Sequence, residues 1–292
     1  MLLPRKKRIV PLHLLVVASF FILTTANGQT SEAKGESGHS SNGDEKDKKG
    51  SFEWGLTVGV HFAGDRSAGF YNGDHPKGRI ERLLNRSRIR KEIRNELQKD
   101  FSFSGYTPPS DMSYKTSYAV GTNFRYMFGK AHEPSIQGEL LFSRLKTRNF
   151  FYLSVKDPNK AVAERKPYPV EGAENRFLFS LDLHDEGSGK PFRPYYGVGL
   201  TVGYADAIRN RISIGGLSYP ILPSDDPRYG APEVQKGVVL GGQGELGLKL
   251  RTGKEWDLSL SGKVSYSKVD IGADPAFDLQ GAVYFRLIRT SL

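Results

Sequence analysis

A histidine beside a carboxylate is the arrangement in this sequence that comes nearest to acid–base catalysis. His61 and His75 both lie close in sequence to Asp65 and Asp74. General acid–base catalysis requires such groups within hydrogen-bond reach, so these four residues form the candidate catalytic cluster of a hydrolase. No metal-ligand spacing, phosphate-binding glycine loop or nucleophile elbow accompanies them in the sequence. We therefore expect no enzyme activity, no cofactor and no bound metal.

A second chemical feature is the basic stretch at residues 79–99, which holds eight cations and three anions. Its arginines suit phosphates, because a guanidinium forms paired, charge-assisted hydrogen bonds. The stretch either caps a neighbouring structure as a solvated surface or binds an anionic partner. The residues expected to face the anion are Arg79, Arg82, Arg86, Arg88, Arg90, Lys91 and Arg94.

Apolar residues in the same stretch predict two short helices within residues 79–98. Two apolar triplets would lie on opposite sides of one continuous helix at about 100° per residue, and a break near Ser87 removes this conflict. We expect each helix to lay its apolar stripe on the structure it covers. The triplets are Ile80, Leu83 and Leu84, then Ile89, Ile93 and Leu97.

The composition predicts β-structure around these features. The chain of 292 residues has 33 Gly, 17 Phe and 14 Tyr, and glycine is costly inside helices while aromatic residues favour strands. The absence of cysteine excludes disulfides, thiolate metal sites and a lipid anchor on an N-terminal cysteine. The formal net charge of +10 includes four cations in residues 5–8, and without them the charge gives little support to nucleic acid as a partner.

Residues 1–28 have the pattern of a cleaved secretory signal peptide. Four cations precede a mostly apolar run at 9–25, and small residues stand before the cleavage site. Residues 29–50 contain no large apolar side chain and so predict a disordered polar lead-in. The folded part is expected at 51–292.

From Phe52 onward, apolar residues alternate with small or polar ones, as in a strand with one apolar face. The connections between such segments alternate long and short, and the first long one spans 64–113. An even number of antiparallel strands with apolar residues outward and long loops on one side is typical of a bacterial outer-membrane barrel. The eight segments lie at about 52–62, 114–128, 135–149, 173–185, 192–206, 237–251, 255–269 and 277–290.

We therefore predict an all-β fold, an eight-stranded antiparallel transmembrane β-barrel with long extracellular loops and a partly helical first loop over the barrel mouth. A soluble barrel of the lipocalin kind, or a sandwich, would turn the apolar face inward and expose mainly Gly, Ser, Thr and Ala to water. Eight strands enclose just enough space for side chains to fill, so the alternative of a small-solute transport barrel needs a wider lumen. A second alternative is a lipid hydrolase with a rim site at His61 and His75.

Charged residues on the small-residue face predict ion pairs inside the lumen. Counting outward from the three short turns places residues of opposite sign opposite each other, and such pairs stabilise by about 0.2–1 kcal/mol. Glu245, Lys263 and Arg286 are expected to extend this network as a structural plug rather than an ion path. The predicted pairs are Arg125 with Glu139, Asp182 with Arg193, and Lys249 with Asp257.

Three sequence motifs also resemble those of a known family. They are Phe70-Tyr71-Asn72-Gly73-Asp74 followed by RIERLL, the PSDMSY run from Pro109 to Tyr114, and the FRPYYGVGL run from Phe192. These resemble the outer-membrane β-barrel domain family that includes PorT-like proteins, with an architecture similar to the small OmpX and OmpA barrels. The resemblance covers about 52–292 and implies a part in protein secretion. Many such barrels end in an aromatic residue that the insertion machinery recognises. This chain instead ends Arg289-Thr290-Ser291-Leu292, and Phe285 or Leu287 is expected to take the place of that aromatic residue.

Together these patterns predict a non-enzymatic, monomeric protein of the bacterial outer membrane that acts in surface binding, structure or secretion assembly. The expected partners are outer-membrane lipid or lipopolysaccharide, and a protein at the first extracellular loop.

Overall fold

The computed structural model describes residues 51–74, 79–109, 111–128, 134–187, 191–221, 235–253, 255–271 and 276–290. The predicted signal peptide and lead-in lie outside the described residues, as does the candidate catalytic residue His75. Within the described part, no helix is long and apolar enough to cross a membrane.

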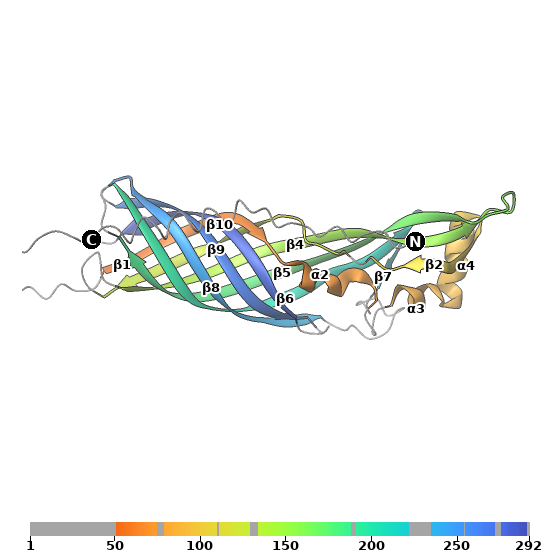
Figure 1. Ribbon diagram of the computed structural model, residues 1–292, viewed down its shortest axis with the longest axis horizontal. Coiled ribbons are helices and arrows are strands. Elements are labelled where there is room, and N and C mark those ends of the chain that lie inside the picture. Colours follow the sequence, from red (N-terminus) through yellow and green to blue (C-terminus); the bar gives the residue numbers. More distant parts are fainter. Residues whose placement is uncertain are drawn as a thin grey trace, which may run out of the picture. The chain divides into compact units, whose positions relative to one another are not determined.

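Eight antiparallel strands close into a ring (Figure 1). Closure comes from β1, which pairs with β3 on one side and with β10, the last strand, on the other. The predicted fold class is therefore confirmed. The ring strands are β1 (Ser51–Phe62), β3 (Ser117–Met127), β4 (Ser135–Lys156), β5 (Glu164–Glu186), β6 (Phe192–Ile214), β8 (Lys236–Arg251), β9 (Trp256–Asp270) and β10 (Ala276–Thr290).

The outer wall of the ring carries an apolar belt bounded by aromatic side chains. On β9, exposed Trp256 and Tyr266 mark the two edges; they lie about 33 Å apart along the strand, or about 25 Å along the axis for a strand tilted by about 40°. An apolar band of about 25 Å between two aromatic girdles is the surface of a membrane-spanning barrel. The outer girdle is Phe62, Tyr118, Phe142, Phe177, Tyr204, Tyr266 and Phe277, and the inner girdle is Phe52, Trp54, Tyr126, Phe128, Phe192, Tyr196 and Trp256.

Beyond the outer girdle, β4, β5 and β6 continue into a second folded region, here called the head (the described residues within 65–109, 147–172 and 209–221). A short strand adds to each edge of this extension, because β2 pairs with β4 and β7 pairs with β6. Helices of the first loop lie beside the extended strands (Figure 1). The head elements are α2 (Asp65–Ala68), η1 (Gly69–Asn72), α3 (Ile80–Leu84), α4 (Ser87–Leu97), β2 (Asp100–Thr107) and β7 (Leu217–Pro220).

The head has its own hydrophobic core. Ile80, Leu84 and Ile93 on the two helices are fully buried, and they belong to one apolar cluster with Phe151 of β4 and Ile212 of β6. Burial of one such side chain stabilises by about 1.5–3 kcal/mol. The head is therefore built like a water-soluble domain.

β4 shows how one strand serves both regions. Its inward face carries polar residues such as Gln137 and Glu139 within the barrel, and then apolar residues such as Phe151 and Leu153 in the head. Its outward face changes from exposed Leu140 to a run of exposed cations, which exposed Phe150 follows. The exchange follows from the surroundings, since lipid lies outside the barrel and water outside the head.

The helices predicted within 79–98 are confirmed as α3 and α4, with the break where it was expected. Their expected place over the barrel mouth is wrong, because their apolar stripes pack on the extended strands of the head. β4, β5 and β6 run further than predicted, which shortens the β4–β5 connection to residues 157–163. β2 lies within the long first loop, where no strand was predicted.

Candidate functional site

The lumen holds three layers of polar side chains, and the inner cluster lies nearest the short turns. Arg125 of β3 pairs with Glu186 of β5, on the far side of β4, and Lys249 Nζ lies 2.7 Å from Glu53 Oε1. Every side chain in the cluster is at most 15% exposed. Three acids and three bases therefore neutralise one another. They are Glu53, Glu186, Asp257, Arg125, Arg193 and Lys249.

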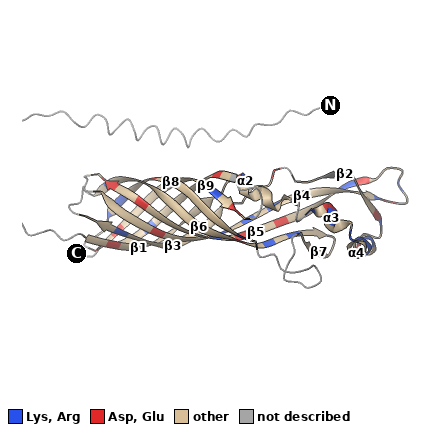
Figure 2. Cartoon of the chain, turned by 90° about the horizontal axis from the view of Figure 1, so that it is seen from below, with Lys and Arg blue, Asp and Glu red and all other residues tan. Residues whose placement is uncertain are grey.

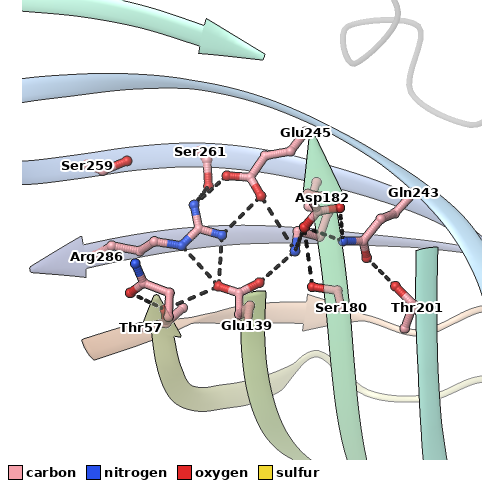
Figure 3. Close-up of polar contacts among 12 residues, drawn as sticks. Thr57, Glu139, Ser180, Asp182, Thr201, Gln243, Glu245, Ser259, Ser261 and Arg286 are labelled. Atoms are coloured by element: carbon pink, nitrogen blue, oxygen red, sulfur yellow. Dashed lines mark hydrogen bonds and ion pairs between the residues drawn. The ribbon is translucent and has the colours of Figure 1, made fainter. Parts of the chain in front are cut away.

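The middle cluster centres on Arg286 of β10 (Figure 3). Its guanidinium donates to Glu139 of β4, with 2.8 Å between Nη2 and Oε1, and also to Glu245 of β8. Lys263 Nζ lies 2.6 Å from Glu139 Oε2 and 3.5 Å from Glu245 Oε2. Asp182 completes the cluster by accepting two hydrogen bonds from Gln243. Because each buried charge has an opposite partner, the cluster can lock the walls of the barrel together.

The outer cluster joins the barrel to the head. Arg176 of β5 donates to Glu174 and to Gln280, and all three side chains are buried. Glu174 also accepts hydrogen bonds from the hydroxyls of Tyr71 and Tyr114, at 2.8 and 2.7 Å. Burial and then the Glu174 carboxylate raise the pKa of both tyrosines well above its ordinary value, so both remain protonated donors.

An apolar layer crosses the lumen between the middle and outer clusters. Ala119, Leu141, Ala282 and Tyr284 form one buried group there. The cavity beside it measures about 20 Å³, which is room for about one water molecule. Side chains therefore plug the barrel at this level.

The predicted lumen residues all lie inside the barrel, but two of the three predicted pairs are wrong. Arg125 stands opposite Gln137 and not Glu139, and its ionic partner is Glu186 on β5. Asp182 stands opposite Gly199, because the β5–β6 hairpin has a different register from the one counted. Arg193 instead binds Glu186 and Asp257.

The third predicted pair, Lys249 with Asp257, forms an ion pair although the two residues do not stand opposite each other. Lys249 stands opposite Ser259, yet its Nζ reaches Asp257 Oδ2 at 3.3 Å. Lys263 and Arg286, expected as extensions of the network, are instead its centre. Lys263 stands opposite Glu245 on the neighbouring strand, but both cations also bind Glu139 on β4, a contact that hairpin counting could not find.

Asp182, His184 and Glu245 bring three potential metal-ligating atoms within 4.8 Å of one another. Both carboxylates already accept hydrogen bonds, Asp182 from Gln243 and Glu245 from Arg286. The ammonium of Lys263 lies 3.9 Å from Asp182, where it opposes a second cation. We therefore assign these three residues to the ion network of the lumen and not to a metal site.

The candidate catalytic histidine is enclosed in the lumen. His61 contacts Ser143 Oγ at 3.2 Å and Gln280 Oε1 at 3.1 Å, and it is 4% exposed. The partners expected for it, Asp65 and Asp74, lie in α2 and just after η1. A serine–histidine contact has the elements of a nucleophile and base, but here both side chains are buried, away from a lipid substrate.

Some cations of the basic stretch are paired, and others have no ionic partner among the described residues. On α4, Arg88 pairs with Glu92, Arg94 with Asp100, and the guanidinium of Arg90 lies over the Phe101 ring. Arg79, Arg82 and Arg86 instead line an open hollow of about 510 Å³ with Glu81 and Asn85, and Lys91 is exposed. Charged residues recur around α3 and α4 as well as along the barrel strands (Figure 2).

Two contacts hold the helices that present this hollow. Gly73, at a φ of 76°, accepts a hydrogen bond from the Ile80 backbone, and a Cβ there would meet the Ile80 side chain at 2.3 Å. Glu96 on α4 accepts from the Gly216 backbone in the β6–β7 turn at 2.7 Å. These contacts therefore hold α3 and α4, and with them the residues that line the hollow, in place.

These features define the class of the protein, a transmembrane β-barrel with a plugged lumen and a folded head at its long-loop end. No family model and no curated protein matches the chain. Among solved structures, it is similar to Ail, the attachment invasion locus protein of Yersinia pestis, crystallised with the heparin analogue sucrose octasulfate. The identity is 10% and the TM-score 0.31, over 83% of this chain and 98% of that chain.

Proposed function

We propose that this protein is a non-enzymatic surface-binding protein of the bacterial outer membrane, and that its head binds an anionic partner. One observation carries the proposal. Arg79, Arg82 and Arg86 are exposed around an open hollow, and they make no ion pair with any described residue. Arginine fits this role because its planar donors match phosphate, sulfate and carboxylate oxygens.

The remaining features support this role over the alternatives. Filling of the lumen by ion clusters and an apolar layer argues against a transport barrel. Enclosure of His61 and Ser143 argues against a rim hydrolase. The outer-membrane location is supported by the apolar belt, the long loops at one end and the leader pattern of residues 1–28.

A finer form of the proposal is a part in protein secretion, which the resemblance to PorT-like proteins implies. The anionic partner would then be an acidic segment of a secreted or assembly protein. The same hollow would serve, since carboxylates and phosphates share the geometry that arginine recognises.

The test is binding of polyanions to the detergent-folded barrel. We expect dextran sulfate or polyglutamate to bind while uncharged dextran does not, and binding to weaken between about 0.1 M and 1 M salt as the Debye length falls from about 10 Å to about 3 Å. The triple variant Arg79→Gln, Arg82→Gln, Arg86→Gln should lose binding. The control, Arg88→Gln, Lys91→Gln, Arg94→Gln, removes the same charge from α4 and should retain most of it. Equal losses of binding in both variants would show that binding depends only on net charge, and would contradict the hollow as the binding site.

A further inference from the structure

Three cations gather on the outer wall of the barrel, directly beyond the outer aromatic girdle. Arg144 and Lys146 follow Phe142 on the outward face of β4, and both are exposed. Lys115 joins them from the segment before β3, where its backbone N–H donates to the Lys146 carbonyl at 2.8 Å. We call these three residues the wall cations.

The wall cations have no acidic neighbour in the strand ladder. Arg144 stands opposite Asn175 of β5, and Lys146 stands opposite Ala173. None of the three makes an ion pair with a described residue, whereas the next cation along β4, Arg148, reaches Glu171 at 3.7 Å. Like charges placed side by side on one face of a sheet destabilise it. An anion from outside the protein would remove this cost.

The height of the wall cations identifies that anion. The rings of Phe142 and Phe177 are in contact, tilted to each other with centroids 4.9 Å apart on the outer girdle, and Tyr118 beside them is 82% exposed. Aromatic girdles lie at the level of the lipid headgroups. Arg144 is one outward position beyond Phe142, about 7 Å along the strand, which places its guanidinium where headgroup phosphates lie.

We propose that Lys115, Arg144 and Lys146 form a binding site for the phosphate groups of a phosphorylated glycolipid in the outer leaflet. The inference rests on the proposed orientation in the outer membrane, with the head outside, and is separate from the hollow beside α3. Arg144 supplies a paired donor to one phosphate and the two lysines supply compact charges beside it. Phe142, one outward position nearer the barrel than Arg144, contacts the acyl chains below.

The experiment measures the thermal midpoint of barrel unfolding in zwitterionic micelles with added lipid. A ligand that binds only the folded state raises this midpoint. We expect bisphosphorylated lipid A to raise the midpoint of the wild-type protein, and dephosphorylated lipid A or free inorganic pyrophosphate to leave it nearly unchanged. In the variant Lys115→Gln, Arg144→Gln, Lys146→Gln the lipid concentration needed for half the effect should rise at least about fivefold, as expected for lost charge-assisted contacts.

Two controls separate this inference from the proposed function. The variant Arg79→Gln, Arg82→Gln, Arg86→Gln removes the same charge from the head and should keep the lipid A response while losing polyanion binding. Conservative replacement by Lys115→Arg with Lys146→Arg should also keep the response. An unchanged response in the wall-cation variant would overturn the site. An equal response to dephosphorylated lipid A, or to pyrophosphate alone, would overturn its assignment to a lipid phosphate.

Discussion

Arg286 of β10 and Glu139 of β4 meet across the lumen, with 2.8 Å between Nη2 and Oε1. Around the ring, β1 and β3 separate the two strands. The contact therefore braces parts of the wall that no backbone ladder connects directly. Both side chains are at most 1% exposed, so water screens the pair very little.

Replacing Arg286 with leucine should lower the free energy of unfolding by about 3–5 kcal/mol, because Glu139 and Glu245 would keep their charges without their main partner. Urea-induced unfolding followed by tryptophan fluorescence measures this change. The control Arg289→Gln lies on the same strand, half-exposed and 3.7 Å from Glu255, and should shift stability by less than about 1 kcal/mol. Similar midpoints for the two variants would contradict the bracing role.

Charge reversal at Arg125 tests the inner cluster. Arg125→Glu should destabilise the barrel by facing Glu186 with a like charge, and Glu186→Arg in the same protein should recover part of the loss. Glu139→Arg should make the loss larger instead, because it would place a cation beside Lys263 and Arg286. Thermal midpoints of the two double variants decide between these partners, and rescue by Glu139→Arg would contradict the observed register.

Ile93→Ala should weaken the head and spare the barrel. Ile93 is fully buried in the head core, and such a truncation typically costs about 2–5 kcal/mol. We expect faster proteolysis within residues 79–99 and unchanged heat-modifiable migration on a gel. Lys91→Ala, on the exposed face of the same helix, serves as the control. Loss of heat-modifiable migration in Ile93→Ala would show that the barrel depends on the head core.

The plugged lumen predicts that the purified wild-type protein gives no steady single-channel conductance in planar bilayers. The apolar layer around Leu141 and Tyr284 leaves space for about one water molecule beside it. Regular conductance steps from folded protein would instead support the small-solute transport barrel.

A pH effect is expected where α4 meets the tip of β4. Lys99 Nζ lies 2.7 Å from Asp157 Oδ2, and this bond, followed by a hydrogen bond from the Asn159 backbone, lowers the pKa of Asp157. A lowered pKa means that the contact stabilises the head above the ordinary aspartate pKa and is lost as the pH falls through the lowered pKa. Lys99→Gln should move the pKa of Asp157 back up, as measured by NMR titration, and an unmoved pKa would contradict the role of Lys99.

Much of the barrel could be predicted from the sequence, because alternation reports which face of a strand is apolar. The errors in the predicted strand pairing leave the assignment of faces intact. Arg125 was expected opposite Glu139 and stands opposite Gln137, a shift of two residues along β4, and a shift of two keeps every side chain on its own face. Inward residues were therefore identified correctly even where their neighbours were not.

The head could not be predicted in the same way. Its core joins α3 and α4 to the extended strands, and along β4 the inward face changes from polar Glu139 to apolar Phe151. Alternation continues through this change, but the apolar residues move from the outward face to the inward face. The pattern of a membrane strand therefore stops at the membrane although the strand does not. The ion partners of Glu139, on β9 and β10, depend on how the ring closes, which no local pattern encodes.

The continuity of β4, β5 and β6 from the barrel into the head also has a mechanical consequence. A ligand that holds the head against flow pulls along strands whose covalent chain enters the membrane without a break. The hydrogen bonds of an antiparallel ladder lie perpendicular to the strands, so tension along β4 and β6 shears many of the bonds to their barrel neighbours β3 and β8 together instead of unzipping them one at a time. The head is thus tethered so that load passes directly into the membrane-embedded wall.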